Sequence, residues 1–410
     1  MIVLRNARIV PELVPGYDDD KADIVIEGNR IVEILQPQTA SGDEVYDMTG
    51  NTVIPGMIEA HLHLDLCGMD TFEENVQSDS YRVLRALKLA QDNLKKGYTT
   101  VRDLGDRNNI VISLAKAIKD GLVMGPDVLA SGVIITPTEM GNDFFGAMYA
   151  ECDSVQEFRK AVRKQYQLGA DWIKVMATGA VMNPGGEPGS PIIMEEELKE
   201  VCQTAAYVNK PVSVHCHGTR GVKMAIRCGV RTVEHSTIMD DECVRMYKET
   251  DKTFPIPTLS PMKNFSEHSE GLPEHYVEKA RQMKAGSIES IRALYEAGIK
   301  IGWGTDAGVY SGSHGNGIYE FRARVYDAGI PPKECLIQAT RNNAEILGID
   351  SEVGTLAPGK KANIAVFKGK PDEDINDLEN IEMVIKGGDV VVSRWFFKKN
   401  AILVNEERRN

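Results

Sequence analysis

Between residue 56 and about residue 350, short apolar runs alternate with longer amphipathic stretches, and this alternation limits the possible folds most. Each run is typical of a buried strand, and each stretch is typical of the helix that follows it. Counting the run before His61, eight strands can be placed. The other seven are 98–103, 127–134, 171–177, 211–215, 231–235, 253–258 and 300–306. Eight such units close naturally into a barrel, so we expect an α/β protein with a (β/α)8 TIM barrel.

The two ends of the chain resemble each other and differ from the middle. Residues 23–27 and 31–35 flank a Gly-Asn pair and predict a hairpin. Residues 362–367 and 383–392 are similar β-rich runs. We therefore expect a small β-sandwich built from both termini. The predicted division is 1–55 (sandwich, first part), 56–354 (barrel) and 355–410 (sandwich, second part).

The composition excludes some partners. The net charge of -13 and the pI of about 5.2 argue against nucleic acid or an anionic membrane surface. No apolar run approaches the roughly 18 residues of a membrane span, and the first residues lack the pattern of a signal peptide. The seven cysteines are scattered, as in reduced proteins. We expect a cytoplasmic homo-oligomer that binds a small-molecule substrate.

Residues able to bind a metal recur where the predicted strands end. His61 and His63 alternate with Leu62 and so share one strand face. Lys174, His215, His235 and Asp306 lie at or near the ends of later strands. A barrel brings the carboxyl ends of its strands to one rim, where barrel enzymes hold their catalytic groups. Any one of these histidines could be an interior hydrogen-bonded residue, but the ordered set predicts a metal site. Zinc fits it, as do iron, manganese and nickel.

Several motifs resemble those of one enzyme superfamily. They are Pro-Gly-Met-Ile-Glu-Ala-His-Leu-His at 55–63, Thr-Thr-Val-Arg-Asp-Leu-Gly at 99–105, His-Cys-His-Gly at 215–218, Gly-Trp-Gly-Thr-Asp-Ala-Gly at 302–308, and the segments 173–179, 341–348 and 354–362. Together they resemble the amidohydrolase superfamily over nearly the whole chain. More narrowly, they resemble its imidazolonepropionase-related branch, which includes prolidase-like dipeptidases, arginine and lysine carboxypeptidases and ochratoxinase-like amidases.

The resemblance implies two divalent metal ions, most simply zinc. His61, His63 and Asp306 would hold the more buried ion, and His215 and His235 the other. Lys174 would be carboxylated and bridge both ions. Physical chemistry agrees, because burial and nearby cations lower the pKa of a lysine and expose the neutral amine to carbon dioxide. His217 shares a strand face with His215, and the family pattern makes it a substrate or supporting contact.

The implied reaction is hydrolysis of an amide bond in a small molecule, such as a dipeptide or an N-acyl amino acid, by a metal-bridging hydroxide. Asp306 would accept the proton and deliver it to the leaving amine. One alternative is a mononuclear cyclic amidase or deaminase. Deaminases of this superfamily usually carry a glutamate where Gly218 stands and lack the bridging lysine. A non-catalytic scaffold is another alternative, but such relatives typically lack some ligands.

Substrate contacts are less defined by the sequence. The segment 136–151 contains Glu139 and Asn142, which could select a cationic or amide-bearing substrate or could simply face solvent. Arg220 could bind a carboxylate or lie on a helix surface. His314 could contact substrate or belong to an exposed loop. The glycine-rich run 183–189 resembles a flap over the metals.

Overall fold

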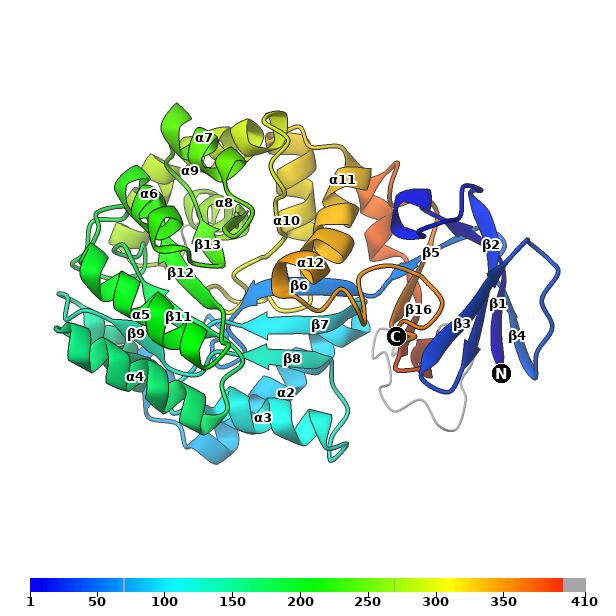
Figure 1. Cartoon of the computed structure of the whole chain (residues 1–410), viewed down its shortest axis with the longest axis horizontal. Coiled ribbons are helices and arrows are strands. Elements are labelled where there is room, and N and C mark those ends of the chain that lie inside the picture. The colour runs from blue at the N-terminus through cyan, green and yellow to red at the C-terminus, as the bar shows by residue number, and fades with distance from the viewer. Residues whose placement is uncertain (69–70, 269, 394–410) are drawn as a thin grey trace.

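The first and last strands of the chain form one eight-stranded sheet, at the right of Figure 1. The computed structural model describes residues 1–68, 71–268 and 270–393. The sheet order is β17-β16-β15-β5-β1-β2-β3, and β4 pairs with β1 beside this path. Its strands are β1 (Ile2–Ile9), β2 (Lys21–Glu27), β3 (Arg30–Leu35), β4 (Glu44–Asp47), β5 (Asn51–Pro55), β15 (Ile364–Lys368), β16 (Ile381–Lys386) and β17 (Asp389–Ser393).

This sheet joins the two ends of the chain. β5 pairs antiparallel with β15 from Pro55–Ile364 to Asn51–Lys368. β2 and β3 form the predicted hairpin, paired from Glu27–Arg30 onward. Residues 394–410, the end of the expected second sandwich part, lie outside the described residues.

The middle of the chain has parallel strands connected through helices. β6, β7 and β8 form one sheet, and a second has the order β10-β9-β11-β12-β13-β14. The strands are β6 (Met57–Leu62), β7 (Tyr98–Asp103), β8 (Asp127–Ala130), β9 (Ile134–Thr136), β10 (Tyr149–Glu151), β11 (Ile173–Met176), β12 (Val212–Cys216), β13 (Thr232–His235) and β14 (Phe254–Ile256). The α-helices are α1 (Thr71–Asn75), α2 (Asp79–Lys95), α3 (Ile110–Lys119), α4 (Val155–Leu168), α5 (Glu195–Tyr207), α6 (Thr219–Cys228), α7 (Asp241–Glu249), α8 (Ser260–Glu267), α9 (Glu274–Glu296), α10 (Ile318–Arg322), α11 (Pro332–Ile337) and α12 (Asn343–Leu347).

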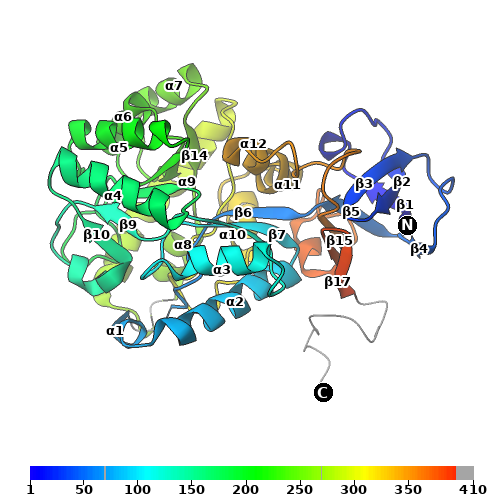
Figure 2. The same cartoon turned by 60° about the horizontal axis from the view of Figure 1, so that its bottom comes forward.

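β5 and β6 carry the chain from the terminal sheet into this α/β unit almost without interruption (Figure 2). Gly56 is the one residue between them. A Cβ atom at Gly56 would lie 2.2 Å from Oγ1 of Thr99, so the neighbouring strand β7 leaves no room for a side chain. The glycine thus lets β6 pack against β7 and places His61 at the end of β6.

The run 127–134, expected as one strand, is two strands in different sheets. β8 pairs with β7, whereas β9 pairs with β11. Gly132 between them has a φ of +68°, a left-handed conformation that interrupts an extended strand. The amide of Ser131 still donates to the carbonyl of Asp103 in β7, so the chain stays beside β7 where it passes from one sheet to the other.

The run 300–306, also expected as a strand, forms no regular ladder. The amide of Gly302 donates to Pro255 in β14, while the amide of Asp306 donates to His61 in β6. A Cβ atom at Gly302 would lie 2.1 Å from Ile256, and one at Gly304 would lie 2.7 Å from the Cβ of His61. The segment therefore lies tightly between β14 and β6. The strands β6 to β14 of the described residues form two sheets, and a single closed barrel is not detected among the described residues.

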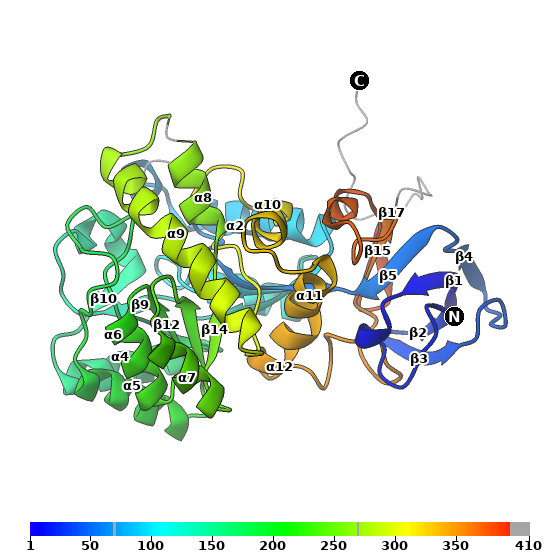
Figure 3. The same ribbon diagram turned by 90° about the horizontal axis from the view of Figure 1, so that it is seen from above.

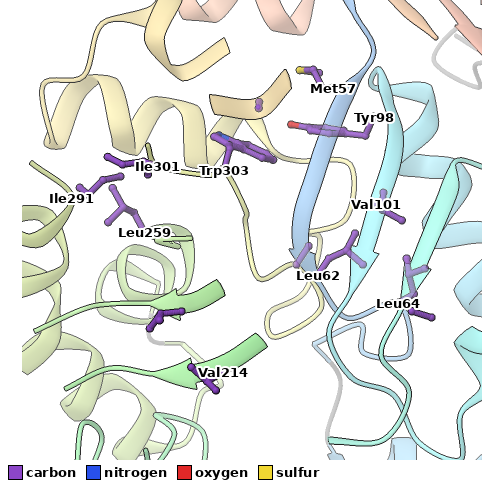
Figure 4. Packing of buried hydrophobic residues seen from close by; sticks show 14 of the residues in the cluster. Met57, Leu62, Leu64, Tyr98, Val101, Val214, Leu259, Ile291, Ile301 and Trp303 are labelled. Carbon is purple, nitrogen blue, oxygen red and sulfur yellow. The ribbon is translucent and has the colours of Figure 1, made fainter. Parts of the chain in front are cut away.

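Large apolar side chains fill the space between these strands and the helices. Trp303 stacks on Tyr98 with ring centroids 5.4 Å apart, and Leu62, Val101 and Val214 belong to the same buried cluster (Figure 4). α8 lies beside the long helix α9 (Figure 3), and Phe265 packs on Tyr276 between them. No helix of the described residues combines the length and apolar character needed to cross a membrane.

Candidate metal centre

The six predicted ligands meet at the carboxyl ends of the parallel strands. All six are buried: His61, His63, Lys174, His215, His235 and Asp306. They line one cavity of about 70 Å³ together with His217. Residues far apart in the chain therefore converge because parallel strands end at one edge.

The distances between their ligand atoms suit metal coordination. Nε2 of His61 and Nε2 of His63 each lie 3.4 Å from Oδ1 of Asp306. Nε2 of His235 lies 2.9 Å from Nδ1 of His215. Two sets have all their ligand atoms within 4.8 Å of one another: His61 with His235 and Asp306, and His215 with His217 and His235. His217, expected beside the ligands, is thus as close to them as a ligand would be.

Contacts behind the rings orient the imidazoles. Nδ1 of His63 donates to the carbonyl of Gly105 at 2.9 Å. Nδ1 of His235 lies 2.7 Å from Oγ1 of Thr258, and Nδ1 of His217 lies 2.8 Å from Oγ1 of Thr237. Each contact leaves the opposite nitrogen for the cavity, as is usual for metal-binding histidines.

Two site residues have unusual backbone conformations. His235 has a φ of +69° and Asp306 a φ of +57°, values that side chains other than glycine rarely adopt. The amide of Asp306 donates to the carbonyl of His61 at 2.7 Å, which holds the turn in place. Such strain persists where the surrounding structure demands it, most often at functional sites.

Burial sets the protonation of the cavity. It lowers the pKa of His61 to about 4 and that of His217 to about 3. Burial alone would raise the pKa of Asp306, but His61 and His63 hold it below its ordinary value. At neutral pH the imidazoles of His61 and His217 are therefore neutral and Asp306 is a carboxylate, which are the forms that bind metals.

Lys174 provides a direct test of whether the residues fit the metals. Burial lowers its pKa to about 8, and Nζ is buried with no hydrogen-bond partner among the described residues. A buried amine without a partner is costly. A carbamate on Nζ would supply two oxygens to metals in the same cavity, so the donor set fits the expected centre.

A buried charged pair, Arg102 and Glu234, lies behind His61 and was not among the predicted site residues. Nη2 of Arg102 donates to Oε1 of Glu234 at 2.9 Å, and both side chains are fully buried. Oε2 of Glu234 lies 2.9 Å from Nδ1 of His61. In the sequence, the pair could have been found as a charged residue inside each of two buried strands, Arg102 in β7 and Glu234 in β13.

The five predicted substrate contacts are placed unequally. Only His217 lines the cavity. Nδ2 of Asn142 donates to Pro137 and Glu151 within its own segment. Arg220 is exposed on the first turn of α6. Nε2 of His314 lies 2.9 Å from the carbonyl of Leu66, an arrangement that ties two loops together.

Glu139 contacts the segment 179–191, which contains the glycine-rich run and is called the flap from here on, instead of the cavity. Nδ2 of Asn183 donates to Oε2 of Glu139 at 3.3 Å. From α9, Nζ of Lys279 donates to the carbonyls of Asn183 at 2.7 Å and Gly186 at 2.5 Å. The segment 179–191 is thus fastened over the site from two sides.

Comparison with known proteins defines the class. The model of the Amidohydrolase family matches residues 52–391, so this chain belongs to that family. Families of this kind generally use divalent metals, and the protein is a hydrolase that acts on carbon–nitrogen bonds.

Individual relatives agree with this class. The chain is 29% identical to ochratoxinase of Aspergillus niger over 368 residues, which cover 82% of this chain and 75% of that protein. A solved Xaa-Pro dipeptidase with bound methionine has a TM-score of 0.87 and 31% identity, covering 95% of this chain and 99% of the other. A 5-methylthioadenosine/S-adenosylhomocysteine deaminase of Bacillus cereus is 24% identical over 407 residues, covering 87% and 83%.

Proposed function

We propose that this protein hydrolyses an amide bond of a small molecule at a centre of two divalent metal ions, with zinc as the expected metal. The observation that carries the proposal is the convergence of four histidines, Asp306 and the unpaired amine of Lys174 in one buried cavity. Dipeptides and N-acyl amino acids contain this bond and are the first substrates to test. The ochratoxinase and dipeptidase relatives support the same bond type.

The ligand assignment is part of the proposal. His61, His63 and Asp306 would hold one ion, His215 and His235 the other, and carboxylated Lys174 both. His217 would contact substrate, although its distance from His215 and His235 also permits it to bind metal. Bound metals supply an activated water and polarise the scissile carbonyl.

The chain's own residues carry the proton. The pKa of Asp306 lies below its ordinary value, so its carboxylate is free to accept a proton at neutral pH. From its position between His61 and His63 it would hold that proton and pass it to the leaving nitrogen. The buried walls keep bulk water out while this happens.

Replacing Asp306 tests the proposal. Asp306→Asn keeps the shape of the side chain and an oxygen ligand but removes the basic oxygen. We expect kcat to fall by about a thousandfold or more, while metal content measured by mass spectrometry stays largely unchanged. Asp143→Asn, on the loop after β9, is a matched control that should leave kcat unchanged. Full activity of Asp306→Asn would refute the proton role.

Deamination is the second candidate, because a deaminase is among the relatives. The cavity argues against it, since Gly218 stands where deaminases usually carry glutamate and Lys174 lies among the ligands. Ammonia release from 5-methylthioadenosine by the zinc-loaded protein, without hydrolysis of any acyl amide, would favour deamination.

The finer architecture and setting also belong to the proposal. We infer a (β/α)8 barrel at 56–354, with the segment 300–306 as its eighth strand, and a β-sandwich at 1–55 and 355–410. The hydrogen bonds from Gly302 to β14 and from Asp306 to β6 support closure. We further propose a cytoplasmic homo-oligomer with a small-molecule substrate and with neither nucleic acid nor a membrane as partner.

A further inference from the structure

The cavity has a polar half and an apolar half. The metal-ligand candidates and His217 form the polar half. The apolar half is formed by Leu66, Ile134, Phe145, Met148, Met176, Ala180, Val181, Met182, Pro261, Met262, Phe265 and Val309. Tyr149 adds one phenol to this half. Among the described lining residues there is no arginine, and Lys174 is the one lysine.

Two lysines on the helices α8 and α9 are already engaged elsewhere. Lys279 donates to two carbonyls of the flap, and Lys263 on α8 pairs with Asp327 at 2.6 Å. Arg220 lies outside the lining. None of these three residues meets a ligand in the cavity.

The phenol of Tyr149 carries no charge at neutral pH. Burial, followed by the charges of Glu139 and Asp306, raises the pKa of the Tyr149 phenol. The phenol therefore offers a substrate anion a hydrogen bond but no opposite charge. His217 and Tyr149 can donate neutral hydrogen bonds, but neutral donors repay only part of the cost of burying a carboxylate.

The apolar half is well suited to a ring. Phe145 packs on Tyr149 with centroids 4.6 Å apart, and Met148 and Met262 provide adaptable sulfur-containing side chains. Burying apolar surface contributes about 25 cal/mol per Å², and aromatic groups bury the most.

We propose that the substrate of the amide hydrolysis inferred above is an apolar, aromatic amide that carries no carboxylate next to the scissile bond. The inference rests on that proposed function. It separates this chain from an enzyme for free dipeptides or N-acyl amino acids, whose substrates place a carboxylate two bonds from the scissile nitrogen.

A matched pair of compounds tests the inference. N-benzoyl-phenylalanine and N-benzoyl-2-phenylethylamine share the scissile amide and both rings and differ in one carboxylate. With the zinc-loaded full chain, we expect kcat/KM to be at least about tenfold higher for the phenylethylamine compound, and its Kd to be correspondingly lower by calorimetry. Equal or better cleavage or binding of the acid would overturn the inference, as would no binding of either compound. Binding of the phenylethylamine compound without hydrolysis of either would instead overturn the proposed function alone.

A charge added to the wall provides the converse test. Met182→Arg would place a guanidinium in the apolar half. We expect it to tighten binding of N-benzoyl-phenylalanine about tenfold and to weaken binding of the phenylethylamine compound. Met194→Arg adds the same charge at an exposed position before α5 and should leave both Kd values unchanged. An equal effect of both variants on the acid would show that net charge, and not the cavity wall, sets the preference.

Discussion

Single buried charges hold the candidate site together. Arg102 reaches Glu234 and also donates from Nε to the carbonyl of Ala60 at 2.6 Å. Burial alone would raise the pKa of Glu234, but the charges of Arg102, His61 and Lys174 hold it well below its ordinary value. Glu234 is thus kept anionic beneath His61, where it can orient the ring.

Removing Arg102 should therefore be costly. Arg102→Met leaves Glu234 buried without its cation, and we expect the free energy of unfolding to fall by about 3–5 kcal/mol. Urea unfolding followed by fluorescence would measure it. Asp120→Asn breaks the surface pair with Lys116 and should cost at most about 0.5 kcal/mol. A loss below 1 kcal/mol for Arg102→Met would contradict the role given to the pair.

At the scale of elements, the flap 179–191 contributes Ala180, Val181 and Met182 to the cavity wall. The cavity of about 70 Å³ is far smaller than the roughly 300 Å³ or more of a typical ligand pocket. The flap is held by Lys279 of α9 and by the contact between Asn183 and Glu139. We therefore expect the flap to move away from α9 when a substrate larger than the cavity enters.

Releasing the flap has a measurable effect. Lys279→Met removes two hydrogen bonds to backbone carbonyls. We expect faster amide hydrogen exchange confined to residues near 179–191, together with a higher KM, because the loosened flap holds substrate less well. Lys284 lies on the same helix as Lys279 and pairs with Glu267 of α8. Lys284→Met is therefore the control and should change neither hydrogen exchange nor KM. Unchanged exchange in Lys279→Met would show that other contacts hold the flap.

At the scale of the whole molecule, the site depends on strands from most of the chain. β6 follows directly on β5 of the terminal sheet, which itself needs β15 from the other end. Arg8 pairs with Asp372 at 2.6 Å across the same junction. We therefore expect folding of the two ends to be coupled to formation of the candidate metal site.

This coupling predicts how metal removal acts. Ions that bind the folded chain at a hundred times their Kd stabilise it by about 2.7 kcal/mol each. We expect a chelator to lower Tm by several degrees and added zinc to restore it. Scanning calorimetry measures the shift. An identical Tm with chelator and with zinc would contradict the metal centre.

Some of the structure is determined by the sequence alone. The period-two alternation puts His61 and His63 on one face, and repeated strand and helix patterns bring strand ends to one edge. These are local regularities, so the cluster of His61, His63, Lys174, His215, His235 and Asp306 could be predicted. The hairpin at Gly28 and Asn29 could be predicted for the same reason.

Other features were decided only by the tertiary structure. The segment near Gly302 and Gly304 lacks a ladder because two neighbouring strands leave it no room, which no local pattern reveals. Arg102 and Glu234 pair across 132 positions of sequence. Asn142 and His314 contain suitable groups but contact other partners, and Arg220 is exposed on α6, because the direction of a side chain depends on packing from distant elements. The apolar cavity wall is likewise assembled from separate loops and helices, so the character of the substrate depends on long-range packing rather than on any motif.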